Sequence, residues 1–83
     1  MIGVTVRVGA GINSLKRVEQ RKYNLPDNIT LSGLMQKLYI CFGEEILKPT
    51  VLVAVNGVAV RNHDHWVLKD ADIVSVIKAN VGG

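Results

Sequence analysis

Hydrophobic and polar positions alternate one by one at the start of the chain. Residues 2–8 (IGVTVRV) place a β-branched residue at every second position, with glycine, threonine and arginine between them. A period of two predicts a strand with one buried face. After the turn GAGINS, the polar segment 17–25 (RVEQRKYNL) predicts a second strand, whose charges suit the edge of a sheet. A hairpin joining the two strands is the simplest topology.

The period changes in the middle of the chain. From Leu31 to Phe42 apolar residues recur at three- and four-residue spacing, which predicts a helix with one buried face. Thr30 is expected to cap the start of this helix, and Gly43 to end it. Gly33 lies in the first turn, where its low helix propensity can be tolerated.

The second half of the chain predicts three further strands. Asn56-Gly57 separates two β-branched runs in residues 51–60, as is typical of a two-residue type I′ hairpin. Residues 61–72 are expected to form an irregular connection, in which Trp66 and Leu68 close one end of the core. The last strand is predicted over residues 73–79.

The order strand, strand, helix, strand, strand, strand predicts an α+β fold, the β-grasp. In it, one main helix packs on one face of a mixed sheet of about five strands, and the last strand pairs in parallel with the first. Val74 and Val76 then face the helix, whereas Ile73 and Ile77 lie on the uncovered face. If these isoleucines are exposed they form a docking surface. The alternative is that the loop around Trp66 covers them, and the sequence leaves both open.

Composition favours one soluble domain over residues 1–83. Hydrophobic residues make up 48% of the chain and charged residues 20%, an ordinary globular balance. No apolar run approaches the ~20 residues that span a bilayer, and the N-terminus lacks a secretory signal. We therefore expect a cytoplasmic protein without a membrane partner. The single cysteine, Cys41, is interpreted as a buried or half-buried apolar residue rather than a catalytic thiol.

The net charge of +3 is concentrated in residues 1–42, which hold six Lys and Arg against two Asp and Glu. A basic half can bind nucleic acid, but no aromatic stacking set accompanies it, so a solvated surface is favoured. His63, Asp64 and His65 are interpreted as loop residues rather than a metal site, because no further ligand cluster accompanies them. No catalytic motif is found. The inventory favours a carrier, substrate or binding module over an enzyme.

The last residues, 80–83, are predicted to form a flexible tail of about 13 Å when extended. Gly83 offers a carboxylate without a Cβ, which can enter a narrow channel, while Gly82 and Val81 give it access. A partner enzyme could adenylate this carboxylate. Attack by sulfur would then give a thiocarboxylate, and attack by an amine an isopeptide bond.

The second half of the chain resembles the ThiS/MoaD family of ubiquitin-like sulfur carriers. The similar segments are VAVNG at 53–57, Val60-Arg61 followed by Trp66, LKDAD at 68–72 and VGG at 81–83. The first half is similar only in its layout. Ala71 departs from the usual glycine of the family's L-x-D-G-D turn, which matters if the turn needs a positive φ.

The resemblance implies that a ubiquitin-activating-type adenylating enzyme uses ATP to activate Gly83, and that a thiocarboxylate forms there. The carrier itself would bind no cofactor. Its further partner would be thiazole synthase or the large subunit of molybdopterin synthase. Arg61 with Trp66 favours the thiamin branch, while the chain length favours the molybdopterin branch. Ile73 and Ile77, with Val81, are the expected partner contacts.

Two alternatives remain open at this level. A ubiquitin-like modifier that forms isopeptide bonds shares every feature above. A non-covalent β-grasp interaction module or RNA-binding module would use the basic hairpin and would not need the diglycine.

Overall fold

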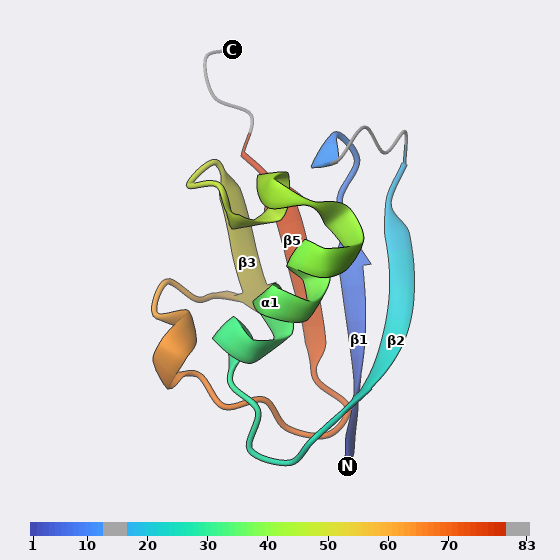
Figure 1. Ribbon diagram of the computed structural model, residues 1–83, viewed down its shortest axis with the longest axis vertical. Helices are drawn as coiled ribbons and strands as arrows, with labels where there is room; N and C mark the ends of the chain where they lie inside the picture. Colours follow the sequence, from blue (N-terminus) through green and yellow to red (C-terminus); the bar gives the residue numbers. More distant parts are fainter. Residues whose placement is uncertain (13–16, 80–83) are drawn as a thin grey trace.

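The computed structural model describes residues 1–12 and 17–79. Five strands in them form one sheet, in the order β2-β1-β5-β3-β4, with β5 parallel to β1 and the other pairs antiparallel. Figure 1 shows α1 lying across one face of this sheet. The predicted α+β, β-grasp arrangement is confirmed. In chain order the elements are β1 (Ile2–Val8), β2 (Glu19–Leu25), α1 (Leu31–Phe42), the 3₁₀ helix η2 (Glu44–Leu47), β3 (Val51–Val55), β4 (Val58–Ala59), the 3₁₀ helix η3 (His63–His65) and β5 (Ile73–Lys78).

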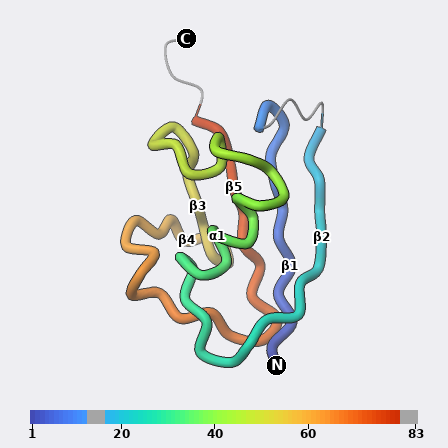
Figure 2. Tube along the Cα trace, in the orientation of Figure 1, coloured from blue at the N-terminus to red at the C-terminus, as the bar shows by residue number. Residues whose placement is uncertain are grey.

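The core lies between α1 and the inner face of the sheet. The buried face of α1 is formed by the residues that its apolar spacing predicts: Leu31, Leu34, Met35, Leu38 and Phe42. The sheet buries alternate residues of its three inner strands against this face: Val4, Val6, Val8, Val53, Val55, Val74 and Val76. Leu68 is also buried and Trp66 packs partly buried against the same core, as predicted. Figure 2 shows the connection from β4 to β5, in orange, running along the left of the view and then below the sheet to the start of β5.

Both predicted ends of α1 are confirmed. The Thr30 hydroxyl accepts a hydrogen bond of 3.2 Å from the Gly33 backbone N–H, which satisfies one of the free donors of the first turn. Gly43 has a φ of 82° and donates its N–H to the Tyr39 carbonyl, so the helix ends there.

The Asn56-Gly57 turn joins β3 to β4 and is also tied to the start of β5. Both residues have a positive φ, 50° and 83°, as a type I′ turn requires. The Asn56 side chain donates to Asp72 Oδ1 at 2.9 Å and accepts from the Ile73 N–H at 2.8 Å. One side chain therefore fixes the hairpin and the approach to the central strand together.

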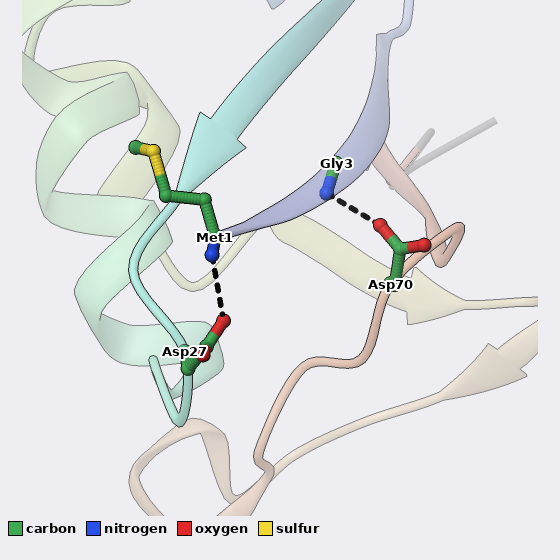
Figure 3. Close-up of polar contacts among 4 residues, drawn as sticks. All are labelled: Met1, Gly3, Asp27 and Asp70. Carbon is green, nitrogen blue, oxygen red and sulfur yellow. Dashed lines mark hydrogen bonds and ion pairs between the residues drawn. The ribbon is translucent and has the colours of Figure 1, made fainter.

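Figure 3 shows two polar contacts at the start of β1. The Met1 ammonium lies 3.1 Å from the Asp27 carboxylate, and the Gly3 N–H donates to Asp70 Oδ1 at 2.7 Å. Gly3 also accepts a hydrogen bond of 2.7 Å from the Ala71 N–H. Ala71 has a φ of 70°, so the turn does require the positive φ that the sequence puts in question.

Three local expectations need correction. Cys41 is exposed, because it points away from the stripe of α1 that ends at Phe42, so its expected burial is wrong. β2 begins at Glu19 rather than at residue 17, and the last strand ends at Lys78. None of the described helices is long and apolar enough to cross a bilayer.

Candidate functional site

The expected reactive residues, Gly83 with Gly82 and Val81, lie outside the described residues. Their roles therefore stay predictions. The site can be built from the point at which the chain leaves the sheet, which is the end of β5, and from the sheet face around it.

Three contacts hold this point to neighbouring elements. The Ala79 N–H donates to the Thr50 carbonyl at 2.7 Å, which continues the pairing of β5 with β3 by one step. Lys78 pairs with Val51, and its Nζ lies 3.2 Å from Glu45 Oε1 on η2. Because β5 lies between β1 and β3, the chain leaves from a position fixed in the middle of the sheet.

The two isoleucines predicted to contact a partner lie on the face that α1 leaves open. Ile73 is 45% exposed and Ile77 is 52% exposed. Trp66 packs against the core instead, so the connection around it does not cover them. Their exposure fits the expected docking surface, while contact with a partner stays a prediction.

Leu52 extends this apolar surface and was not singled out from the sequence. It is 57% exposed and pairs with Ile77 across β3 and β5, so the two side chains stand together on the open face. The signal was the alternation in β3: Val53 and Val55 point inward, and Leu52 therefore points outward. We call Leu52, Ile73 and Ile77 the apolar strip.

Cationic side chains lie beside the apolar strip. Arg7 pairs with Ser75 on β5 and Lys22 pairs with Thr5, so the register places both cations on the open face. Part of the excess positive charge in the first half of the chain therefore lies on the open face, where it borders the apolar strip on the side of β1 and β2.

The loop histidines take part in local contacts. His63 Nε2 lies 3.2 Å from the Val60 carbonyl, and Asp64 accepts a hydrogen bond from the Ser32 hydroxyl near the start of α1. Within residues 1–12 and 17–79, no three His, Cys, Asp or Glu side chains are placed to hold a metal ion. Arg61 and His63 line a hollow of about 580 Å³ beside β3, whereas Trp66 packs against the core.

A second polar group lies at the other edge of the sheet, where β2 meets the end of α1. Arg21 forms an ion pair with Glu19, and its guanidinium lies 5.0 Å from the centre of the Phe42 ring. Burial raises the pKa of the Tyr23 hydroxyl, and the nearby Arg21 partly offsets this effect. These contacts pack an edge strand against the helix.

Comparison with known proteins gives a family and a fold. The model of the ThiS family matches residues 6–83. A solved structure described as putative molybdopterin converting factor, subunit 1, from Pyrococcus furiosus is 22% identical, with a TM-score of 0.71, over 95% of this chain and 99% of that one. SAMP1 from Haloferax volcanii is 15% identical, with a TM-score of 0.74, over 98% and 99%.

Urm1 from Trypanosoma brucei is 25% identical, with a TM-score of 0.67, over 98% of this chain and 95% of that one. No curated protein sequence matches the chain. The structural likenesses agree with the β-grasp topology derived above from strand order and register.

Proposed function

Because this chain belongs to the ThiS family, we propose that it is a sulfur carrier whose working group is the carboxylate of Gly83. The observation on which this rests is the family match over residues 6–83, which includes the end of β1, the other four strands and the diglycine. Gly82 and Val81 give the carboxylate access to a partner's active site. The chain is thus a substrate that partner enzymes recognise and modify.

The chemistry belongs to a ubiquitin-activating-type adenylating enzyme that uses ATP. The Gly83 carboxylate attacks the α-phosphorus of ATP, and pyrophosphate leaves. A sulfide sulfur then attacks the acyl carbon of the adenylate, AMP leaves with the former carboxylate oxygen, and a thiocarboxylate remains. The carrier contributes position and access, so it needs no bound cofactor.

The described structure supports this role through the place where β5 ends. Ala79 is held to Thr50 by backbone hydrogen bonding, and residues 80–83, which lead from it to the proposed working carboxylate, span about 13 Å when extended. An enzyme that holds Gly83 must therefore contact the folded body. The apolar strip, with Ile73 and Ile77, is the surface we propose for that contact.

The sulfur is proposed to pass to thiamin or molybdopterin biosynthesis, or to a related pathway. The corresponding partners are thiazole synthase and the large subunit of molybdopterin synthase. The likeness to the Pyrococcus furiosus structure favours the molybdopterin branch, and the family match favours the thiamin branch. We place the carrier in the cytoplasm, where such partners work.

A ubiquitin-like modifier is the second candidate, and the likeness to SAMP1 and Urm1 supports it. Activation of Gly83 is the same in both cases. A lysine amine then takes the place of sulfur, AMP leaves, and an isopeptide bond forms. Only the product separates the two functions.

Intact mass spectrometry tests the proposal. The chain is incubated with the adenylating enzyme of its host, ATP and a sulfide donor, and a gain equal to one oxygen replaced by one sulfur is expected. The Cys41→Ser variant is the appropriate substrate, because Cys41 is exposed and its oxidation by air to a sulfenic acid would add one oxygen, nearly the same gain in mass as one oxygen replaced by one sulfur. A variant without Gly82 and Gly83 is the control and should show no gain.

Two other results would contradict sulfur carriage. Conjugates in which Gly83 is joined to lysines, without any thiocarboxylate, would identify a modifier. An unchanged mass, with an enzyme that activates a control carrier, would remove sulfur carriage.

A further inference from the structure

The open face of the sheet contains a hollow at the end of β1 and β5. Its volume is about 180 Å³, and it is lined by Arg7, Gly9, Val18, Ser75, Val76 and Ile77. An engineered protein cavity of about 150 Å³ accepts one benzene molecule. The hollow is therefore the right size for one phenyl group or one branched aliphatic side chain.

Gly9 creates this hollow. The registers of β1 with β2 and β5, extended one step beyond Val8, place Gly9 between Val18 and Ile77. The side chains on both sides stand up from the sheet, while Gly9 has none. Its φ is not positive, so the backbone conformation alone does not call for glycine here. Space favours glycine here, because a Cβ at Gly9 would lie 3.3 Å from the Val76 carbonyl oxygen, a tight contact.

The hollow lies next to the point where the chain leaves the sheet. Ile77, which forms one wall, is two residues before Ala79, the residue held to Thr50. Residues 80–83 can span only about 13 Å. If Gly83 enters the active site of an enzyme, as proposed above, the enzyme surface must also cover the hollow. The inference therefore rests on the proposed function.

The charge around the hollow specifies the partner further. Arg7 forms part of its wall, Lys22 lies on the same face, and none of the described residues that line it carries a carboxylate. An arginine at the border of an apolar recess is complementary to a carboxylate beside an apolar side chain. A nucleic-acid phosphate could pair with Arg7 but would leave the apolar recess unfilled, so the lining favours a protein.

We propose that this hollow receives one aromatic or branched aliphatic side chain of the adenylating enzyme, and that a carboxylate next to that side chain pairs with Arg7. The site is a recess in the carrier that shares Ile77 with the apolar strip but includes neither Leu52 nor Ile73. It would anchor the body while Gly83 reaches the ATP site.

Ser75→Leu tests the recess, because Ser75 lines it from a partly exposed strand position where a larger side chain has room to fit. The readout is ATP–pyrophosphate exchange by the host adenylating enzyme at varied carrier concentration. We expect Ser75→Leu to raise the KM for the carrier at least about tenfold with kcat nearly unchanged. Gln36→Leu is the control, because it adds the same side chain on the exposed face of α1. Its KM should stay within about twofold of that of the unsubstituted chain.

Arg7→Glu tests the paired carboxylate. It should raise the KM and weaken its dependence on salt, whereas Lys37→Glu, the same change on exposed α1, should alter both much less. Thermal melts of all variants establish that each is folded at the assay temperature. The recess would be overturned if the enzyme catalyses ATP–pyrophosphate exchange with the unsubstituted chain and the folded Ser75→Leu variant has the same KM. That result would leave the proposed function intact.

Two more outcomes separate the alternatives. No exchange with the unsubstituted chain, by an enzyme that accepts a control carrier, would overturn the proposed function and the recess together. Binding of RNA that depends on Arg7 and competes with the enzyme, without sensitivity to Ser75→Leu, would assign this face to nucleic acid instead.

Discussion

Ala71 is an alanine where the backbone conformation favours glycine, and Ala71→Gly is therefore expected to stabilise the fold. Its φ of 70° lies in the left-handed region, which costs a residue with a Cβ about 1–2 kcal/mol. Glycine removes this strain but gives the unfolded chain about 0.4–1 kcal/mol more conformational entropy to lose. The net gain in the free energy of unfolding should be about 0.5–1 kcal/mol. The hydrogen bond from the residue 71 N–H to the Gly3 carbonyl uses only backbone atoms and is kept.

Urea unfolding followed by the fluorescence of Trp66 measures this gain. Trp66 is the only tryptophan and is partly buried against the core, so its emission reports on the folded state. The midpoint should rise with an unchanged m-value, and the melting temperature should rise by about 2–8 °C. A changed m-value would mean that the variant altered the compactness of the folded or the unfolded state, rather than the strain of one residue.

Ala59→Gly is the matched control. It makes the same chemical change at an exposed position of β4 where φ is not positive. This variant should lose about 0.5–1 kcal/mol, because glycine in a strand has only an entropic cost. If Ala71→Gly destabilises the chain by as much as Ala59→Gly, the strain assigned to Ala71 is wrong.

Three further predictions concern the helix and the edge strand. Gly33→Ala should not give the gain of about 1 kcal/mol that helix propensity promises, because the added Cβ would lie 2.9 Å from Ile29 Cγ1; a full gain in urea unfolding would contradict this contact. Leu34→Ala removes a side chain that is fully buried, and should lower the free energy of unfolding by about 2–5 kcal/mol. Tyr23 should ionise with a pKa above the ordinary value of 10.0, measured by ultraviolet titration of Tyr39→Phe, in which it is the only tyrosine. Because the pKa of Tyr23 is raised in the folded state, its protonated hydroxyl contributes stability below pH 10, and this contribution is lost as the pH rises beyond 10. Tyr23→Phe should abolish that part of the loss of stability at alkaline pH. A titration midpoint of Tyr23 at or below 10.0 would contradict its burial.

The fold could be predicted because its signals are local and agree with one another. The period of two in β1, the period of 3.6 in α1 and the Asn56-Gly57 turn each specify one element, and few topologies accommodate that order. Ile73 and Ile77 could be placed on the open face by counting alternate residues once Val74 and Val76 were assigned to the core.

The rest depends on neighbours that are distant in sequence. Cys41 is an exception: cysteine is usually buried, but Cys41 lies outside the apolar stripe of α1, and that local pattern already indicates its exposure. The hollow could not be predicted, because it depends on Gly9 lying between residues of two other strands. Likewise, no local pattern shows that Arg7 and Ser75 are partners across β1 and β5.

Gly9 and Ala71 differ in how well each residue fits its backbone. Ala71 occupies a turn where glycine would relieve strain, whereas a Cβ at Gly9 would lie 3.3 Å from the Val76 carbonyl oxygen, so glycine fits the close approach there. Ala71 precedes β5, at the opposite end of that strand from the point where the chain leaves the sheet. Its strain can therefore be removed without changing a residue of the apolar strip. The missing side chain at Gly9 instead shapes the surface beside that exit. Stabilising Ala71→Gly should therefore leave the KM for the adenylating enzyme unchanged, whereas filling the hollow should raise it.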